Sequence, residues 1–420
     1  MKIAINSLLV LLVATAAAWA IDEEAPATGT QLTLDDMRTF TDVFNQIRNN
    51  FVEETDDREL LNAAIRGMLS ELDPHSSYME AEEFRKMDND SQGRYSGIGV
   101  ELALRDRQMQ VVFVIQDGPA DQAGIVTGDV ITAIDGADLR GSDQQLAINA
   151  LRGEVGSEVE VTVQHVNGEV STYTVTRGFV EVNSVFSRPV DRDYGYFQIT
   201  HFTRKSAEEL AEQIEYMQDN RKQPLKGIVL DLRGNPGGVL QPAIDIADGF
   251  LENGLIVEMH GRADYQAQHS AHAGSWLTGI PMVVLVDGRS ASASEVLAGA
   301  LQDHGRALIV GKKTFGKGSV QSVLNLRNGS GMRLTTSRYY TPSGRSIQAE
   351  GIQPDIEIPS VQAIEAQDSP RRKADLDRHL DGESNPDSEA FESAVSPFDD
   401  YAMYQALILL KGAAALSPSN

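Results

Sequence analysis

The chain has 420 residues, of which 41% are hydrophobic and 23% are charged, and its formal net charge at pH 7 is -25. This length and apolar content are enough for two or three domains with at least one large core, and they exclude an intrinsically disordered protein. The negative charge disfavours nucleic acid and anionic lipid as direct partners, because their phosphates would be repelled. The lack of cysteine excludes disulfides and thiol chemistry.

Residues 1–20 have the pattern of a secretory signal peptide. Lys2 lies near the start, an apolar run covers residues 8–18, and Ala18-Trp19-Ala20 forms a small-residue cleavage site. We therefore expect an exported, periplasmic protein. The alternative is that the segment is retained as a membrane anchor, although its apolar run is short for a bilayer span.

Residues 21–92 are predicted to form a helical region. A helix over residues 33–53 would have Thr33 as its N-cap and one apolar face, and a second helix is predicted over residues 58–72. Two helices with exposed apolar stripes are marginal alone. We therefore expect them to pack on the body of the protein or on a second copy, which would make the protein a homo-oligomer.

The segment Asp73-Pro74-His75-Ser76-Ser77-Tyr78 follows the second helix and has the composition of a turn. His75 is a candidate catalytic base, but a turn residue that hydrogen-bonds locally is the favoured interpretation.

Residues 93–180 change to short strands and tight turns. A helix is predicted over residues 142–151, followed by alternating strands over residues 158–164 and 170–176 around an Asn-Gly turn. The loop Gly97-Ile98-Gly99-Val100 and the run G-P-A-x-x-A-G-x-x-x-G-D-V-I over residues 118–131 resemble those of a PDZ domain.

The glycines of such a loop let successive backbone N–H groups converge on a carboxylate, while the adjacent sheet edge accepts an extended peptide. Gly97, Ile98, Gly99 and Val100 are therefore the candidate residues for binding a peptide C-terminus. The expected partners are proteins or peptides with free C-termini. For the loop alone, a simple hairpin is the alternative.

Residues 181–360 alternate between apolar strands and helices, which is typical of an α/β domain with a largely parallel sheet. Runs such as G-I-V-L-D-L are apolar almost throughout, as expected of strands covered on both faces. Strands are predicted over residues 195–200, 227–232, 255–257, 281–286 and 307–310, helices over residues 206–218, 242–251 and 293–301, and edge strands over residues 331–340 and 356–358.

The predicted fold class is thus a mixed α/β core with a parallel-rich sheet, an inserted β-rich PDZ domain and an N-terminal helical segment. Residues 361–420 are predicted to be a polar linker that leads to a helix over about residues 400–413. That helix would dock on the body of the protein or on a partner subunit.

The residues with reactive chemistry concentrate between positions 288 and 321. Three alternate serines, Ser290, Ser292 and Ser294, follow a predicted strand and lead into a helix. A serine at such a turn lies beside backbone N–H groups that lack helical partners and can stabilise an oxyanion. The hydroxyl also needs a base that takes its proton.

Lys317, in the segment Phe315-Gly316-Lys317-Gly318, is the favoured base. A free lysine has a pKa of about 10.4, and burial among apolar neighbours lowers it. Phe315 is expected to shield the amine, and the two glycines allow a close approach of the backbone. Lys312 and Lys313 are expected to be solvated.

Other chemistries fit the sequence less well. A Ser-His-Asp triad stays an alternative, but His304 is expected to be a solvated helix cap, and His269 and His272 to lie in a polar loop. No third zinc ligand has recognisable spacing, so no metal is predicted. Residues 311–317 match the start of a phosphate-binding P-loop, but Gly318 stands where Ser or Thr is required, so no nucleotide or other cofactor is predicted.

The run D-L-R-G-N-P-G-G over residues 231–238 lies at the carboxyl end of a predicted buried strand, where ligands of such sheets bind. Its glycine pair could present N–H groups to an oxyanion, and Arg233 or Asn235 could brace the loop. An ordinary strand-to-helix turn is the alternative.

This run, the S-A-S-A-S-E run over residues 290–295 and the F-G-K-G run over residues 315–318 together resemble the carboxyl-terminal processing peptidases. Members of this family are serine peptidases with an inserted PDZ domain, and the resemblance extends from the N-terminal helices to about residue 360. It implies that Ser292 is the nucleophile, that Lys317 is the general base and that Gln321 orients the lysine. The family's serine-to-lysine spacing of 25 is met by these two positions.

The resemblance also implies that the backbone N–H groups of Ala293 and Gly238 hold the oxyanion, with Gly237 as the alternative to Gly238. A Lys-Gln arrangement is expected to leave no buried carboxylate that would keep the lysine protonated.

The resulting hypothesis is an exported serine endopeptidase that binds the substrate's C-terminus and cleaves upstream of it. The resemblance implies that this C-terminus is apolar, and it leaves room for an adaptor protein among the partners. Two alternatives stay open, a non-catalytic PDZ scaffold and a serine hydrolase of ester bonds.

Overall fold

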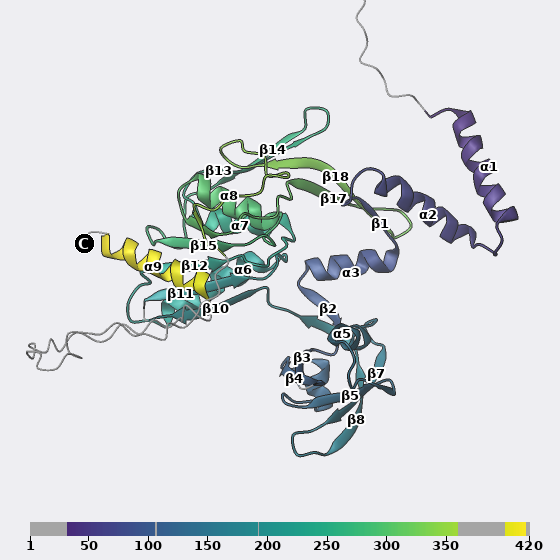
Figure 1. The fold of residues 1–420 in the computed structure, drawn as a ribbon, viewed down its shortest axis with the longest axis horizontal. Coiled ribbons are helices and arrows are strands. Elements are labelled where there is room, and N and C mark those ends of the chain that lie inside the picture. Colours follow the sequence, from purple (N-terminus) through teal and green to yellow (C-terminus); the bar gives the residue numbers. More distant parts are fainter. Residues whose placement is uncertain (1–31, 106, 192, 360–399, 417–420) are drawn as a thin grey trace, which may run out of the picture. The chain divides into compact units, whose positions relative to one another are not determined.

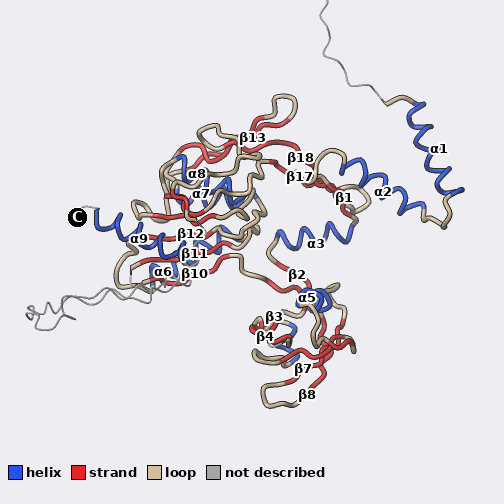
Figure 2. Tube along the Cα trace, viewed as in Figure 1, coloured by secondary structure: helices blue, strands red, loops and turns tan. Residues whose placement is uncertain are grey.

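The computed structural model describes residues 32–105, 107–191, 193–359 and 400–416. The predicted signal peptide and the predicted linker of residues 361–399 lie outside these ranges. The chain divides into two compact units, residues 1–68 and residues 69–420. Figure 1 labels the helices and strands, and Figure 2 shows their distribution along the chain.

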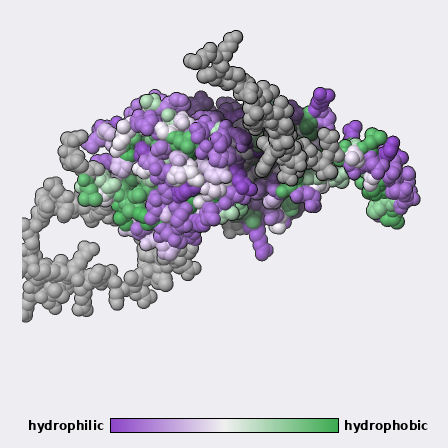
Figure 3. All heavy atoms as spheres, turned by 90° about the horizontal axis from the view of Figure 1, so that it is seen from above, coloured by the Kyte–Doolittle hydropathy of each residue, from purple (hydrophilic) through white to green (hydrophobic). Residues whose placement is uncertain are grey.

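The first unit contains α1 (Leu34–Asn50) and most of α2 (Asp57–Ser70). Thr33 caps α1 as predicted, because its hydroxyl accepts the N–H of Asp36 while the Asp36 carboxylate accepts the N–H of Thr33. Large apolar side chains of α1 and of its C-cap residue are open to solvent (Figure 3); these are Met37, Phe40, Val43 and Ile47 in the helix and Phe51 at the cap.

The predicted turn lies in the second unit, just after the end of α2. The Asp73 carboxylate accepts the N–H groups of His75 and Ser76, so the favoured interpretation of this segment as a locally hydrogen-bonded turn is confirmed. β1 (Ser77–Met79) and α3 (Ala81–Ser91) follow, and neither element was predicted.

The PDZ region has a five-stranded antiparallel sheet, extended by the short β6 (Ala137–Asp138). The predicted strands at residues 158–164 and 170–176 form at those positions as a hairpin, whereas the predicted Gly-Pro-Ala turn opens the short helix α4 (Pro119–Ala123). α5 (Gln144–Leu151) is the predicted helix. In spatial order the strands are β3 (Val100–Arg105), β4 (Gln108–Val114), β5 (Val130–Ile134), β7 (Glu158–Gln164) and β8 (Val170–Thr176), while β2 (Arg94–Gly97) pairs with β9 (Gly178–Glu181).

The α/β core has a six-stranded sheet in which all neighbours after the first pair are parallel. This agrees with the predicted parallel-rich sheet. The strands, in spatial order, are β10 (Val185–Val190), β11 (Tyr194–Ile199), β12 (Gly227–Asp231), β15 (Met282–Val286), β16 (Leu308–Gly311) and β19 (Ile356–Glu357).

Helices cover both faces of this sheet (Figure 1). Ile228 and Leu230 of β12 belong to the core formed with α6 (Ser206–Asp219), α7 (Leu240–Phe250) and α8 (Ala293–Asp303). Val229 points to the opposite face, where α9 (Tyr401–Leu416) packs. Burial on both faces explains why these strands are apolar throughout, and the C-terminal helix docks on the body of its own chain.

A second sheet contains the ten-residue β18 (Gly331–Tyr340). The prediction of an edge strand at this position was wrong, because β18 has β1 and β13 (Gly254–Gly261) along one side and β17 (Ser319–Asn325) along the other. Its length lets two short partners share one side. β14 (Gln266–Ala271) pairs with β13, so His269 lies in a strand and not in the predicted polar loop.

No helix in the described ranges is both long enough and apolar enough to span a bilayer.

Candidate active site

Ser292 is the N-cap of α8 and lies at the turn that follows β15. Its backbone has φ +56° and ψ -113°, a conformation that costs free energy for a residue with a Cβ. Backbone strain of this kind is concentrated at functional sites, where the surrounding structure maintains it. The half-buried Ser292 is the most accessible serine of the S-A-S-A-S run.

The other two serines of this run have structural hydrogen bonds. The Ser290 hydroxyl donates to the carbonyl of Leu232 at 2.8 Å, and the Ser294 hydroxyl donates to the carbonyl of Asn235 at 3.1 Å. Both side chains are buried. They attach the helix start to the loop that follows β12, which leaves Ser292 as the candidate nucleophile on geometric grounds.

Lys317 lies in the segment between β16 and β17 and is half-buried. Burial lowers the pKa of its ammonium group, the charge of Arg333 lowers it further, and the Asp73 carboxylate acts in the opposite direction. The net shift favours the neutral amine, which is the form that a general base requires.

The two glycines around Lys317 allow a close backbone approach. A Cβ at Gly318 would lie 2.2 Å from the backbone nitrogen of Gln348. The expected role of Phe315 was wrong, because this side chain is 64% exposed and so provides little shielding. Backbone packing, and not an aromatic cover, accompanies the burial of the lysine.

A buried carboxylate links the serine turn to the lysine segment. Glu295 is 0% exposed, and one of its oxygens accepts both the Ser292 N–H at 2.7 Å and the Lys317 N–H at 2.9 Å. The two backbones are therefore neighbours, although 25 positions separate them in the sequence. Glu295 contacts the backbone N–H of Lys317 and is not among the causes of its pKa shift, so it does not contradict the expectation that no buried carboxylate keeps the lysine protonated. The sequence signal for Glu295 is the Ser-x-x-Glu capping spacing.

The loop of residues 231–238 lies against the serine turn. A Cβ at Gly237 would lie 2.9 Å from the Cβ of Ser292 and 3.2 Å from the nitrogen of Ala293. Asn235 braces the loop, because its amide donates to the Ile199 carbonyl and its side-chain oxygen accepts the Gly237 N–H. The Gly237 N–H therefore already donates a hydrogen bond and is not free to bind an oxyanion.

The N–H groups of Gly238 and Ala293 have no hydrogen-bond partner among the described residues. Gly238 has φ +141°, and a Cβ there would lie 2.2 Å from the Phe202 carbonyl oxygen, so only glycine fits. Ala293 is the first residue of α8, where the helix dipole favours negative charge. These two donors suit an oxyanion better than the Gly237 alternative does.

Gln321 lies on β17, and its amide nitrogen donates to the hydroxyls of Ser319 at 3.0 Å and Thr335 at 3.1 Å. Neither contact is with Lys317. The structure therefore places Gln321 on a neighbouring strand without bringing its amide into a hydrogen bond with the candidate base.

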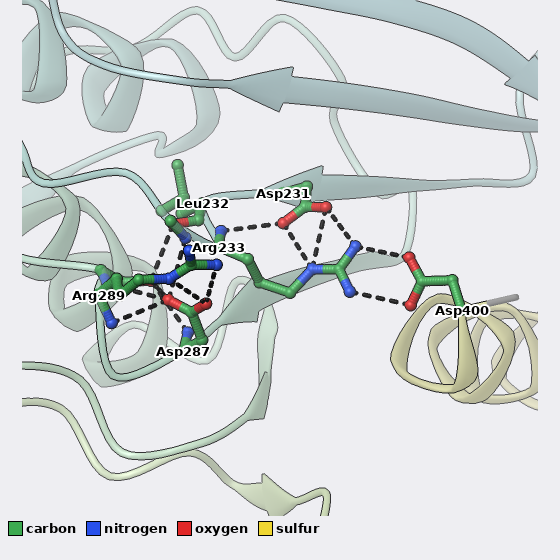
Figure 4. Close-up of polar contacts among 8 residues, drawn as sticks. Asp231, Leu232, Arg233, Asp287, Arg289 and Asp400 are labelled. Carbon is green, nitrogen blue, oxygen red and sulfur yellow. Dashed lines mark hydrogen bonds and ion pairs between the residues drawn. The ribbon is translucent and has the colours of Figure 1, made fainter. Parts of the chain in front are cut away.

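Arg233 connects the same loop to the C-terminal helix (Figure 4). Its guanidinium forms an ion pair with Asp231 at 2.6 Å and a second ion pair with Asp400 at 2.8 Å, and Asp400 directly precedes α9. Asp287 receives the Gly234 N–H at 3.0 Å and thereby holds the next part of the loop. These charges support the loop and do not point to a metal, since the described ranges contain no group of three or more His, Cys, Asp and Glu arranged to bind one.

The predicted carboxylate-binding loop lines a groove of about 1040 Å³. Gly97, Ile98, Gly99 and Val100 all contribute to it, and in the described structure the N–H groups of Ile98 and Gly99 have no hydrogen-bond partner. Apolar side chains of the PDZ region complete this part of the wall; they include Leu102, Ile148 and Leu151.

Comparisons with known proteins agree with this architecture. Residues 193–358 match the model of peptidase family S41, residues 96–176 match that of the PDZ domain, and residues 13–83 match that of the activating protease CtpB N-terminal domain. The chain thus has the domain content of a PDZ-containing serine-type peptidase.

Several related proteins align with most of the chain. A carboxy-terminal-processing protease of Bartonella bacilliformis is 39% identical over 390 residues, which are 91% of this chain and 90% of that protein. The carboxy-terminal processing protease CtpA of Bacillus subtilis is 32% identical, over 74% of this chain and 67% of that protein. A solved structure, the photosystem II D1 C-terminal processing protease, aligns over 76% of this chain and 86% of its own, at 30% identity and a TM-score of 0.47. The Bartonella relative and the family match over residues 193–358 show that the chain belongs to peptidase family S41, among the carboxy-terminal processing proteases.

Proposed function

We propose that this peptidase cleaves proteins near their C-termini, with Ser292 as nucleophile and Lys317 as general base. One observation carries the proposal. Ser292 is the accessible serine of its run, and its backbone shares one carboxylate oxygen with Lys317, whose ammonium has a lowered pKa.

The neutral amine of Lys317 takes the proton of the Ser292 hydroxyl as the oxygen attacks the scissile carbonyl. The N–H groups of Ala293 and Gly238 stabilise the oxyanion that forms. The Lys317 ammonium then gives the proton to the leaving amine. A water molecule, activated by the same lysine, hydrolyses the acyl-enzyme.

Gln321 orients Lys317 in this proposal. Its amide nitrogen donates to Ser319 and Thr335, so its side-chain oxygen is the group that would accept a hydrogen bond from the lysine. Substitution by alanine should lower kcat without abolishing it, by up to roughly 100-fold.

A fluorophosphonate probe tests the nucleophile and the base. We expect peptide mass spectrometry to find the probe on Ser292 alone, with no labelling of Ser292→Ala and much slower labelling of Lys317→Ala. Circular dichroism and tail-peptide binding should be unchanged in both variants. A label on Ser290 or Ser294, or an unchanged rate in Lys317→Ala, would overturn the assignment.

The groove beside Gly97–Val100 binds the substrate's free C-terminus, and its apolar wall favours an apolar last residue. The free N–H groups of Ile98 and Gly99 support this step, because unpaired donors in a partly buried loop suit a carboxylate.

The test of the groove is peptide binding to Ser292→Ala, which cannot cleave its ligand. A peptide ending in a free apolar residue should bind more tightly than the same peptide with an amidated C-terminus. Replacing its last residue by aspartate should also weaken binding. Equal affinity for the free and amidated peptides would contradict recognition of the C-terminus.

The pattern of residues 1–20 supports export to the periplasm, with membrane association if the segment is retained. The exposed apolar stripe of α1 supports a homo-oligomer formed through the N-terminal helices, and an adaptor protein is a further partner that this surface could accept. Sedimentation at micromolar concentration that gives only the monomer would contradict the oligomer.

A further inference from the structure

Glu295 is a fully buried carboxylate that the proposed reaction does not use. One of its oxygens accepts the Thr314 hydroxyl at 2.5 Å and the Gly316 N–H at 2.6 Å. The other oxygen accepts the N–H groups of Ser292 and Lys317. Every one of these four donors belongs either to the serine turn or to the segment that carries the lysine.

We propose that Glu295 is a positioning residue, which fixes the geometry between the nucleophile and the general base by holding both backbones on one carboxylate. The inference rests on the proposed roles of Ser292 and Lys317. It adds a residue that contacts neither the substrate nor the reacting atoms but determines whether the two reacting groups meet.

A carboxylate is required at this position because each of its oxygens receives two donors. A glutamine has one acceptor oxygen, and its amide nitrogen would face two donors and form no hydrogen bond with them. An aspartate is one methylene shorter and would not span the same pairs of donors. The site therefore discriminates against both conservative replacements.

The hydrogen bonds of Thr314 show that its own hydroxyl proton points toward Glu295. The Ile352 N–H donates to the Thr314 oxygen at 2.7 Å, so the threonine hydroxyl is an acceptor from Ile352 and a donor to Glu295. Thr314 is itself buried. Replacing it by valine removes one of the four donors while nearly keeping the volume, whereas serine keeps the hydroxyl.

Glu295 acts by position and not by tuning the base. Its contact with Lys317 is to the backbone N–H, whereas burial, Arg333 and Asp73 are the causes of the lowered pKa of the side chain. Loss of the carboxylate should therefore slow the reaction without moving the pH at which the base titrates. This distinguishes a positioning role from an electrostatic one.

The experiment uses the whole mature protein and the fluorophosphonate probe. We expect Glu295→Gln to lower kcat and the labelling rate by roughly 100-fold, the size of effect that an ångström of misplacement can have. KM, tail-peptide affinity and the midpoint of the pH-rate profile should be unchanged. Thr314→Val should lose roughly tenfold and Thr314→Ser little, which keeps the test valid if Glu295→Gln does not fold. The matched control is Glu212→Gln, on the exposed side of α6.

The final extent of labelling separates positioning from simple destabilisation. A positioning role predicts complete labelling of the folded protein at a reduced rate. If Glu295→Gln and Thr314→Val melt at a lower temperature but react at the wild-type rate, Glu295 is only structural and the inference fails. If wild-type protein is not labelled at Ser292 at all, the proposed function fails instead.

Discussion

At the scale of single residues, the sequence offered three serines and the structure separates them by their hydrogen bonds. Ser290 and Ser294 are buried and donate to backbone carbonyls, while Ser292 has a strained backbone beside two N–H groups that have no partner in the described part of the chain. Position 292 could be singled out from sequence only by family spacing. The physical reason for the choice lies in contacts with residues 232 and 235, which no local pattern shows.

Two charged residues, Arg333 and Asp73, shift the pKa of Lys317 in opposite directions, which gives a prediction for each of them. The base must be neutral to act, so its pKa sets the acidic limb of the pH-rate profile. Arg333→Gln removes a charge that lowers the pKa of Lys317, and the limb should move to higher pH. Asp73→Asn removes a charge that raises this pKa, and the limb should move to lower pH. The measurement is kcat/KM against pH for both variants and the wild type.

A general loss of stability would not move the acidic limb of the two variants in opposite directions. Opposite shifts would therefore come from the two charges near Lys317. If both variants move the limb in the same direction, or if neither moves it, Lys317 is not the titrating base.

Sequence alone misjudged one residue of the site and gave no role to another. Phe315 was expected to shield Lys317 but is 64% exposed, and Glu295 was assigned no role. Glu295 could be recognised as a capping residue from its spacing to Ser292, but its bonds to Thr314, Gly316 and Lys317 depend on how two loops meet.

At the scale of elements, most of the core was predictable because its strands are buried on both faces and its helices are periodic. The location of α9 was not predictable. Its buried residues Met403, Leu407 and Leu410 cover the sheet face opposite α8, and Asp400 reaches Arg233 across 167 positions of sequence. The sequence shows that α9 has apolar residues, but it does not show on which surface the helix packs.

The Arg233–Asp400 ion pair should contribute to stability. Burial is the largest single influence and raises the pKa of Asp400, but the hydrogen bonds from Arg233 and the Met403 N–H and the charges of Arg233 and Arg188 together lower it more, so the net shift is downward. Asp400→Asn should reduce the free energy of unfolding by about 1–3 kcal/mol at neutral pH. Because the folded pKa is lowered, this contribution is present above the ordinary value of about 3.9 and is lost as the pH falls through the lowered one.

Urea denaturation of Asp400→Asn at neutral and acidic pH measures this contribution. The control is Asp264→Asn, an exposed position in a left-handed conformation that asparagine also adopts. Equal stability of Asp400→Asn and wild type at neutral pH would show that α9 is held by its apolar face alone.

At the scale of the whole molecule, the chain combines a peptidase core, a groove lined by the Gly97–Val100 loop and an N-terminal unit with an exposed apolar stripe. The order of these parts was predictable from changes in periodicity along the sequence. The prediction of β18 as an edge strand failed because its partner β1 comes from residues 77–79, before the PDZ region, so the sheet is completed by a segment far away in sequence.

The most direct test of the account is the cleavage of an unfolded protein that ends in apolar residues. The wild-type protein should release fragments cut upstream of that C-terminus, as mapped by mass spectrometry. Ser292→Ala and Lys317→Ala should release none, while both fold and bind the tail as the wild type does. Full cleavage by either variant would contradict the Ser292–Lys317 mechanism.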